Sequence, residues 1–278
     1  MTLPTFLGIG VPKAGTTWLH NLLDTHPDAY VPQKAKEVRF FNRYYDLGLD
    51  WYEGFFPPDR EADQYQAVGE ITPHYLYCEE CPQRMAVLPV RPKLILMLRN
   101  PIDRAWSNYL FRVRLDNYGG SFERFLDESP NVIQWGFYCQ HIQRYQAHFE
   151  PDELLILLFD QVFNDTTKAR KTIADFLDLA PGAFPETAGM NVSNRSYLPR
   201  FRSFYALTTR AQKAVRGRHQ YWITDLAKKI GVQRIRGVEG GEPSPMRDET
   251  RQRLNALYAQ EISDLETLLQ TDLSQWRS

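Results

Sequence analysis

The sequence predicts an α/β fold of three layers, in which a central parallel sheet is flanked by helices. Short apolar runs typical of buried strands alternate with segments whose apolar residues recur at helical spacing. Such alternation indicates a parallel sheet covered on both faces. The 278 residues, 43% hydrophobic and 24% charged, suffice for a substantial core. We therefore expect one domain over residues 1–278.

The expected elements follow from these patterns. Strands are predicted at 6–11, 67–71, 93–98 and 154–159, and helices at 138–149 and 169–177. A longer amphipathic pattern predicts a C-terminal helix at about 247–270, after glycines and prolines that break the chain at 237–245. Residues from about 200 to 245 are interpreted as an elaboration on the domain.

The first predicted strand runs into Pro12-Lys13-Ala14-Gly15-Thr16-Thr17-Trp18, where a helix begins. A glycine lets the backbone approach an anion closely, the threonines offer hydroxyl donors, and Lys13 brings a mobile positive charge. The N-terminus of a helix favours anions. The pattern therefore predicts a phosphate-binding loop. It is not a Walker A motif, because the lysine precedes the glycine, and this disfavours a nucleotide kinase.

A second anion-binding group follows the strand predicted at 93–98. Arg99 stands where that strand ends, and ligands of open α/β sheets bind at the carboxyl ends of strands. Asn100 and Pro101 predict a helix start, with Ser107 about two turns further on. An arginine fork and a serine hydroxyl can together hold a phosphate. The alternative is a structural salt bridge at Arg99 and a surface position for Ser107.

Four segments, in order along the chain, resemble motifs of the sulfotransferases that use 3′-phosphoadenosine 5′-phosphosulfate (PAPS). Residues 12–18 resemble the 5′-phosphosulfate loop, and residues 98–109 resemble the 3′-phosphate segment. Residues 36–41, Lys-Glu-Val-Arg-Phe-Phe, resemble a Lys-Glu-x-x-Phe-Phe stretch of the heparan sulfate branch, and 136–138 resemble its Gly-x-Tyr element. The resemblance implies a P-loop-like fold and a bacterial-type member close to the carbohydrate sulfotransferases.

This resemblance also implies which residues bind PAPS and its product PAP. The cofactor-binding residues would be Lys13, Ala14, Gly15, Thr16, Thr17, Trp18, Arg99, Ser107, Arg195 and Ser196. The tryptophan matching Trp18 stacks on adenine in the cytosolic branch, and plain core packing is the alternative. Residues 191–196 loosely resemble a late loop that closes over the nucleotide. Arg200 is an alternative to Arg195 as the residue that completes the nucleotide site. A solvated basic loop that does not touch the nucleotide is an equal alternative.

The same resemblance implies an in-line transfer of the sulfuryl group to a hydroxyl or an amine. Glu37 would be the general base, and Lys13 would offset charge on the leaving phosphate. On residue chemistry alone, Glu37 beside Lys36 and Arg39 is a surface ion pair. His74 is an alternative or auxiliary base. Ile71 stands where the heparan sulfate enzymes often carry a lysine, and Glu70 is expected to orient the acceptor or a cofactor lysine.

Two other functions stay open on the sequence. One is a nucleotide kinase-like phosphoryl transferase, and the other is a catalytically silent nucleotide-binding protein. The acceptor is a small molecule, a carbohydrate or a carrier-bound group. Aromatic residues between 40 and 56 would line its cleft or belong to the core.

Composition restricts the partners and the location. A net charge of −1 argues against a nucleic-acid binder. The N-terminus lacks a basic-then-apolar signal pattern, and no apolar run approaches ~20 residues. We therefore expect no stable membrane span and a cytoplasmic enzyme, although a trimmed catalytic domain would look the same. Cys78 and Cys81 form a lone CxxC without a second pair or nearby histidines, so no metal site is expected. The oligomeric state is not set by the sequence.

Overall fold

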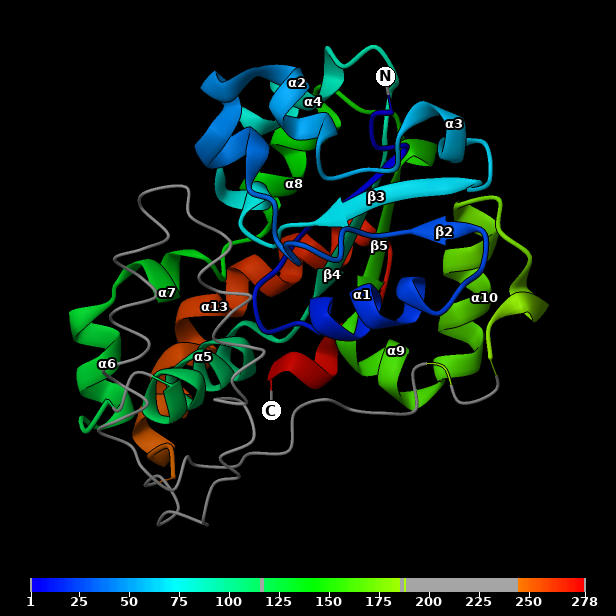
Figure 1. Ribbon diagram of the computed structural model, residues 1–278. Helices are drawn as coiled ribbons and strands as arrows, with labels where there is room; N and C mark the ends of the chain where they lie inside the picture. Colours follow the sequence, from blue (N-terminus) through cyan, green and yellow to red (C-terminus); the bar gives the residue numbers. More distant parts are fainter. Residues whose placement is uncertain (1, 116–117, 186–187, 189–244, 278) are drawn as a thin grey trace. The chain divides into compact units, whose positions relative to one another are not determined.

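The computed structural model describes residues 2–115, 118–185, 188 and 245–277 (Figure 1). They fall into two compact units, each described by itself. The first unit takes the described parts of 1–104, 137–193 and 258–278, and the second takes those of 105–136 and 194–257. The elaboration expected at about 200–245 lies outside the described residues. The single domain stays a prediction.

A five-stranded sheet forms the centre of the first unit. Its strands are β1 (Phe6–Gly10), β2 (Ala29–Tyr30), β3 (Ala67–Ile71), β4 (Lys93–Leu98) and β5 (Leu154–Leu158). They lie in the order β2-β3-β1-β4-β5, and every neighbouring pair is parallel (Figure 1). All residues of β1 and β3 are buried, as expected for a sheet covered on both faces. The predicted α/β fold is confirmed.

Helices cover the two faces of this sheet. They are α1 (Thr16–Asp24), α2 (Gly48–Glu53), α3 (Asp59–Ala62), α4 (Cys81–Ala86), α8 (Cys139–Gln146), α9 (Phe159–Asn164) and α10 (Thr166–Phe176). In the view of Figure 1, α2, α4 and α8 lie above the sheet, and α1, α9 and α10 lie below it. Short turns include a π-helix, η1 (Phe40–Tyr44), and two 3₁₀ helices, η3 (Tyr75–Tyr77) and η7 (Ser274–Arg277).

The second unit is helical. It contains α6 (Phe122–Glu128) and α7 (Asn131–Gln134), while α5 (Pro101–Leu115) and α13 (Asp248–Leu269) run through both units. Ser121 caps α6 by accepting a hydrogen bond from the Arg124 amide at 3.3 Å. Thr250 on α13 donates to the Glu123 carboxylate at 2.9 Å, so α13 is fixed to α6 within this unit. In the part of the chain that the structure describes, none of the helices is both long enough and apolar enough to cross a bilayer.

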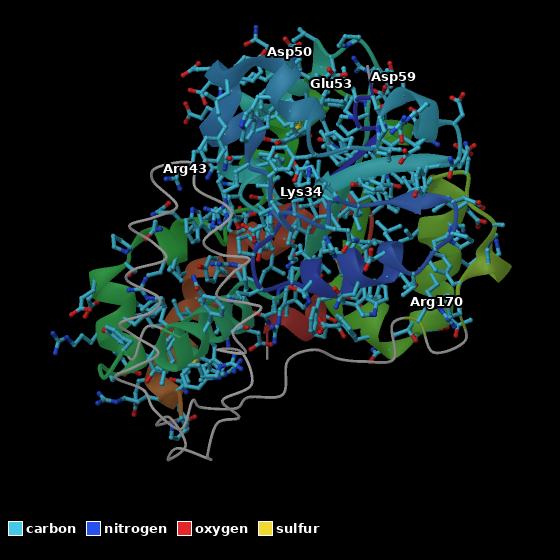
Figure 2. The ribbon with its side chains drawn as sticks, viewed as in Figure 1. Lys34, Arg43, Asp50, Glu53, Asp59 and Arg170 are labelled. Carbon is cyan, nitrogen blue, oxygen red and sulfur yellow. The ribbon has the colours of Figure 1, made fainter. Side chains whose placement is uncertain are left out.

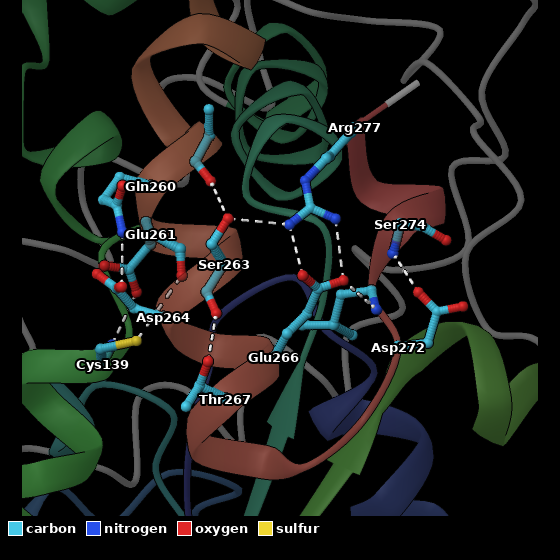
Figure 3. A network of polar contacts seen from close by, with 12 residues as sticks. Cys139, Gln260, Glu261, Ser263, Asp264, Glu266, Thr267, Asp272, Ser274 and Arg277 are labelled. Atoms are coloured by element: carbon cyan, nitrogen blue, oxygen red, sulfur yellow. Dashed lines mark hydrogen bonds and ion pairs between the residues drawn. The ribbon is translucent and has the colours of Figure 1, made fainter.

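A network of polar contacts holds the C-terminal turn in the first unit (Figure 3). Glu266 on α13 accepts hydrogen bonds from the Leu273 amide at 2.8 Å and from the Arg277 guanidinium at 2.9 Å. These bonds fold η7 back against the end of α13. Trp276 is thereby buried, with 1% of its surface exposed. Its carbonyl accepts from the Asn100 side chain at 3.0 Å, and its indole donates to Asp160 at 3.1 Å.

The strand order fixes where a ligand can bind. From β1 the chain crosses toward β2 and β3, whereas from β4 it crosses to β5 on the other side. β1 and β4 are neighbours, so their carboxyl ends flank a topological switch point, which is the usual ligand position in such sheets. The loop that follows β1 and the residues that follow β4 therefore meet at one edge.

Candidate active site

The loop after β1 forms an open cradle of backbone amides. Lys13 and Gly15 both have left-handed backbone conformations, with φ of 74° and 92°, and such turns bring successive N–H groups together. Gly15 is the N-cap of α1, and no side chain caps this helix among the described residues. The first-turn amides are therefore available to an anion. Ala14 and Thr16 are buried beneath the loop, and Thr17 is exposed.

Replacing Gly15 with alanine is expected to weaken PAP binding roughly 10-fold, the effect of losing about one hydrogen bond to a charged group. A Cβ atom there would lie 3.0 Å from Met97 Cε and 3.1 Å from Phe163 Cε2, so the loop would have to shift. Isothermal titration with PAP measures the change.

Gly48→Ala is the matched control. Gly48 also has a positive φ, of 78°, but a Cβ there meets nothing within 4 Å. This variant should lose about 1–3 kcal/mol of unfolding free energy and keep the PAP affinity of the folded protein. Unchanged PAP affinity in Gly15→Ala would contradict the prediction that the backbone amides of this loop bind PAP.

Arg99 lies against this loop. Its Nη1 donates to the Lys13 carbonyl at 3.1 Å, and its guanidinium covers the Phe159 ring, with Cζ 4.4 Å from the ring centroid. Its own carbonyl accepts from the Tyr138 hydroxyl at 2.8 Å. Burial lowers the pKa of Arg99, and the charges of Asp103 and Asp160 oppose that shift. The structure therefore brings together Lys13 and Arg99, which the sequence separates by 86 positions.

The predicted helix start after Arg99 is confirmed. Asn100 Oδ1 accepts from the amides of Ile102 at 2.9 Å and of Asp103 at 3.4 Å, and α5 begins at Pro101. Ser107 lies on α5 in the second unit and is half-buried. Its role, like that of the other predicted site residues, stays a prediction.

Glu37 and His74 lie close to the phosphate loop. Arg39 holds the Glu37 carboxylate through its Nε at 3.1 Å and its Nη2 at 2.6 Å. Burial lowers the pKa of His74; the charge of Glu37 opposes this shift, and those of Arg39 and Lys13 add to it. Burial thus favours the neutral imidazole of His74, with both the predicted base and the loop lysine near it. The Glu37 side chain keeps 27% of its surface exposed, which leaves it accessible to an acceptor.

Lys36 is a further candidate for the site, one that the sequence motifs do not single out. Its Nζ donates to Thr17 Oγ1 at 2.6 Å, so a second cation lies at the N-terminus of α1. Burial lowers the pKa of Lys36, and the charge of Glu37 opposes the shift. The sequence signal for Lys36 is its place next to Glu37 in the Lys-Glu motif, in which the sequence chemistry points first to the glutamate.

The remaining candidates are placed as follows. Trp18 is 3% exposed and lies edge-on to Phe163, with ring centroids 5.5 Å apart. Arg195, Ser196 and the rival Arg200 lie outside the described residues. Glu70 and Ile71, at the end of β3, are both completely buried, so Glu70 cannot touch an acceptor directly.

Part of the aromatic cluster is core. Four of the early aromatic residues are buried, and they are Phe40, Phe41, Tyr52 and Phe56. Phe40 stacks on Tyr52 with ring centroids 4.2 Å apart. Tyr44, Tyr45, Trp51 and Phe55 keep intermediate exposure. Only these last four can contribute to an acceptor surface among the early aromatics.

A parallel sheet with a cationic amide cradle after one strand and an arginine after its neighbour defines a class of α/β proteins that bind phosphorylated ligands. The matching family model is more specific. It is the sulfotransferase domain, it covers residues 3–232, and the chain belongs to that family. The resemblance drawn from the motifs is confirmed.

Two curated relatives are heparan sulfate enzymes. The chain is 33% identical over 199 residues to the human bifunctional heparan sulfate N-deacetylase/N-sulfotransferase 3, a match covering 64% of this chain and 23% of the relative. It is 32% identical over 186 residues to heparan sulfate glucosamine 3-O-sulfotransferase 3A1 from Mus musculus, covering 64% of this chain and 46% of that one. The match thus spans less than half the length of either relative.

Solved structures share the fold. A sulfotransferase from Alicyclobacillus acidocaldarius superposes with a TM-score of 0.69 at 24% identity, and the match covers 100% of both chains. A mouse sulfotransferase in complex with PAP gives a TM-score of 0.50 at 17% identity, covering 96% of this chain and 87% of that one. At these identities the likeness is one of fold.

Proposed function

We propose that this protein transfers the sulfuryl group of PAPS to a hydroxyl or an amine of an acceptor and releases PAP. The observation that carries the proposal is the meeting of Lys13, Arg99, Lys36 and Glu37 around one loop. PAPS supplies an activated sulfuryl group. In the balanced reaction, the bond from sulfur to the bridging phosphate oxygen breaks, a bond from sulfur to the acceptor forms, and the acceptor proton goes to Glu37.

The residues present fit such a donor. The uncapped amides of α1, with Lys13 and Lys36 beside them, would hold the 5′ end. Arg99 would hold the 3′-phosphate, and the part of Ser107 rests on the sequence resemblance alone. The burial of Trp18 favours core packing over stacking on the adenine. The mouse sulfotransferase of the same fold was solved with PAP, which supports this class of ligand.

The chemistry then divides among the chain's own side chains. Glu37 would take the acceptor proton, held by Arg39 in one orientation. Lys13 would stabilise the negative charge that grows on the leaving phosphate. His74, with its lowered pKa, would act as an auxiliary hydrogen-bonding group or as the alternative base.

For the acceptor, we favour a carbohydrate, because the curated relatives are named for heparan sulfate. Figure 2 shows Lys34 and Arg43 apart from the acidic Asp50, Glu53 and Asp59, which lie higher in the same view. Lys34 and Arg43 are exposed on either side of Glu37 in the sequence. They would attract an anionic sugar chain.

The test is transfer of ³⁵S from labelled PAPS to a panel of acceptors. The panel holds desulfated heparan sulfate, simple alcohols and phenols, amines and a carrier-bound acyl chain. Label in any of them, together with PAP binding by titration calorimetry, supports the proposal, and the labelled class identifies the acceptor. Tight PAP binding without transfer to any acceptor or to water would indicate the silent nucleotide-binding protein. Absence of PAP binding, or magnesium-dependent ATP hydrolysis, would overturn the proposal.

A further inference from the structure

Glu70 is a buried carboxylate with an unusual set of partners. It is completely buried at the end of β3. Its Oε2 accepts from the Thr72 hydroxyl at 2.7 Å, and its Oε1 accepts from the hydroxyls of Tyr75 and Tyr52. Burial raises the pKa of Glu70, and the backbone amide of Val38, which faces the carboxylate, opposes that shift. Three hydroxyl donors therefore converge on one side chain, and an ionised carboxylate requires such donors in place of water.

Two of these contacts reach the residues that follow Glu37. Val38, the next residue, turns its amide toward the Glu70 carboxylate. The Arg39 amide donates to Thr72 Oγ1 at 3.2 Å, and the Thr72 hydroxyl passes the connection on to Glu70. The backbone at Arg39 has a left-handed φ of 62°, a conformation that needs support from its surroundings in a non-glycine residue.

Thr72 is itself fixed to the sheet. Its amide donates to the Gly8 carbonyl at 2.9 Å, one strand away on β1. Directed hydrogen bonds therefore connect β1 through Thr72 to the Arg39 amide, and the Thr72 hydroxyl joins this path to the buried Glu70. Arg39 in turn binds the Glu37 carboxylate, so both the backbone and the side chain of the proposed base depend on this segment.

We infer that Glu70 is a positioning residue that anchors the Glu37–Arg39 segment to the sheet and so sets the orientation of the general base. This role rests on the proposed function. It differs from the sequence expectation that Glu70 orients the acceptor or a lysine, because the structure buries Glu70 under the loop. The ionised carboxylate accepts from three hydroxyls, whereas a protonated or amide group replaces one acceptor with a donor, so at least one of these hydroxyls would have to reverse its hydrogen bond and the anchor would change.

The first experiment replaces Glu70 with glutamine, in the full chain at pH 8. Burial raises the pKa of Glu70 to about 7, so the wild-type side chain is mostly ionised at this pH. Turnover, measured as PAP release from PAPS with the best acceptor of the panel, should fall roughly 10–100-fold, because small displacements of a reacting group are costly. PAP affinity should stay within about twofold, since that end of the site lies on the other loop.

A double-mutant cycle separates positioning from general stability. In a Glu37→Gln background, Glu70→Gln should cost less than about twofold further turnover, because the group it positions is gone. Equal losses in both backgrounds would overturn the inference while leaving Glu37 as the base. Wild-type turnover in Glu37→Gln alone would overturn the proposed base instead.

Hydrogen exchange gives a readout that needs no acceptor. In Glu70→Gln, the amides of Val38 and Arg39 should exchange at least roughly 10-fold faster, while those of residues 11–19 stay unchanged. Tyr52→Phe is the matched control: it also removes a donor to Glu70, at 3.4 Å, but one outside the Glu37 segment. The Tyr52→Phe protein should keep the wild-type hydrogen-exchange protection of Val38 and Arg39 and the wild-type turnover. Unchanged protection of Val38 and Arg39 in a folded Glu70→Gln protein would overturn the inference.

A second pair of variants covers the case in which Glu70→Gln does not fold. Thr72→Val removes the hydroxyl that joins Arg39 to Glu70, and Thr72→Ser keeps it. Thr72→Val should lower turnover and speed exchange at Arg39, and Thr72→Ser should restore both. If the two variants behave alike, the connection through Thr72 does not position Glu37 and the inference fails.

Discussion

Glutamine at position 37 is expected to lower the turnover of PAPS by roughly 10²–10⁴ while PAP affinity stays near the wild-type value. The amide keeps the shape of the side chain and can no longer accept the proton of the acceptor. Because Glu37 is paired with Arg39 rather than with the phosphate loop, its loss should not weaken nucleotide binding. Initial rates of PAP release and calorimetric titration with PAP measure the two quantities.

Glu61→Gln is the control for this variant, because Glu61 forms an exposed pair with Arg60 at 3.4 Å. Removing that pair should change neither quantity. Wild-type turnover in Glu37→Gln, with a large loss in His74→Asn, would transfer the role of base to His74.

The second large effect is expected for Lys13→Ala, which should weaken PAP binding roughly 10–100-fold, as the loss of a hydrogen bond to a charged group does. Turnover should fall further, by roughly 10²-fold at saturating PAPS, because the charge that develops on the leaving phosphate would lose its cation. Lys36, bound to Thr17, still supplies one positive charge nearby, so binding should weaken without vanishing.

Lys168→Ala, on the exposed face of α10, is the matched control and should leave both values unchanged. If Lys13→Ala lowered turnover but left PAP affinity intact, Lys13 would act only in the transition state. If neither changed, the loop would not be the donor site.

The fold was largely predictable because its strands are buried. β4 is apolar throughout the span Leu94–Leu98, and buried parallel strands give such runs. β2 was missed since two residues, Ala29 and Tyr30, are too short to carry a pattern. The helix start after Arg99 was predictable because capping is a local effect, decided by neighbours in sequence.

The site was only partly predictable because its contacts join distant segments. The loop residues and Arg99 follow from strand ends, but the bond from Lys36 to Thr17 depends on how the chain returns after β2. A sequence motif includes Glu70, but its burial beneath Val38 and Arg39 depends on tertiary packing, which residue spacing does not reveal. The roles of Arg195 and Ser196, and a cytoplasmic location, stay predictions.

The placement of Trp276 has a consequence for how the protein is made. A ribosome must add 176 residues after Asn100 before the amide of that side chain meets the Trp276 carbonyl. The Trp276 indole also donates a hydrogen bond to Asp160, which directly follows Phe159, the residue whose ring the Arg99 guanidinium covers. A nascent chain that has completed the five described strands still lacks these contacts. The contacts that steady Asn100 and Asp160 therefore form only after Trp276 has been synthesised, long after the strands that precede these two residues.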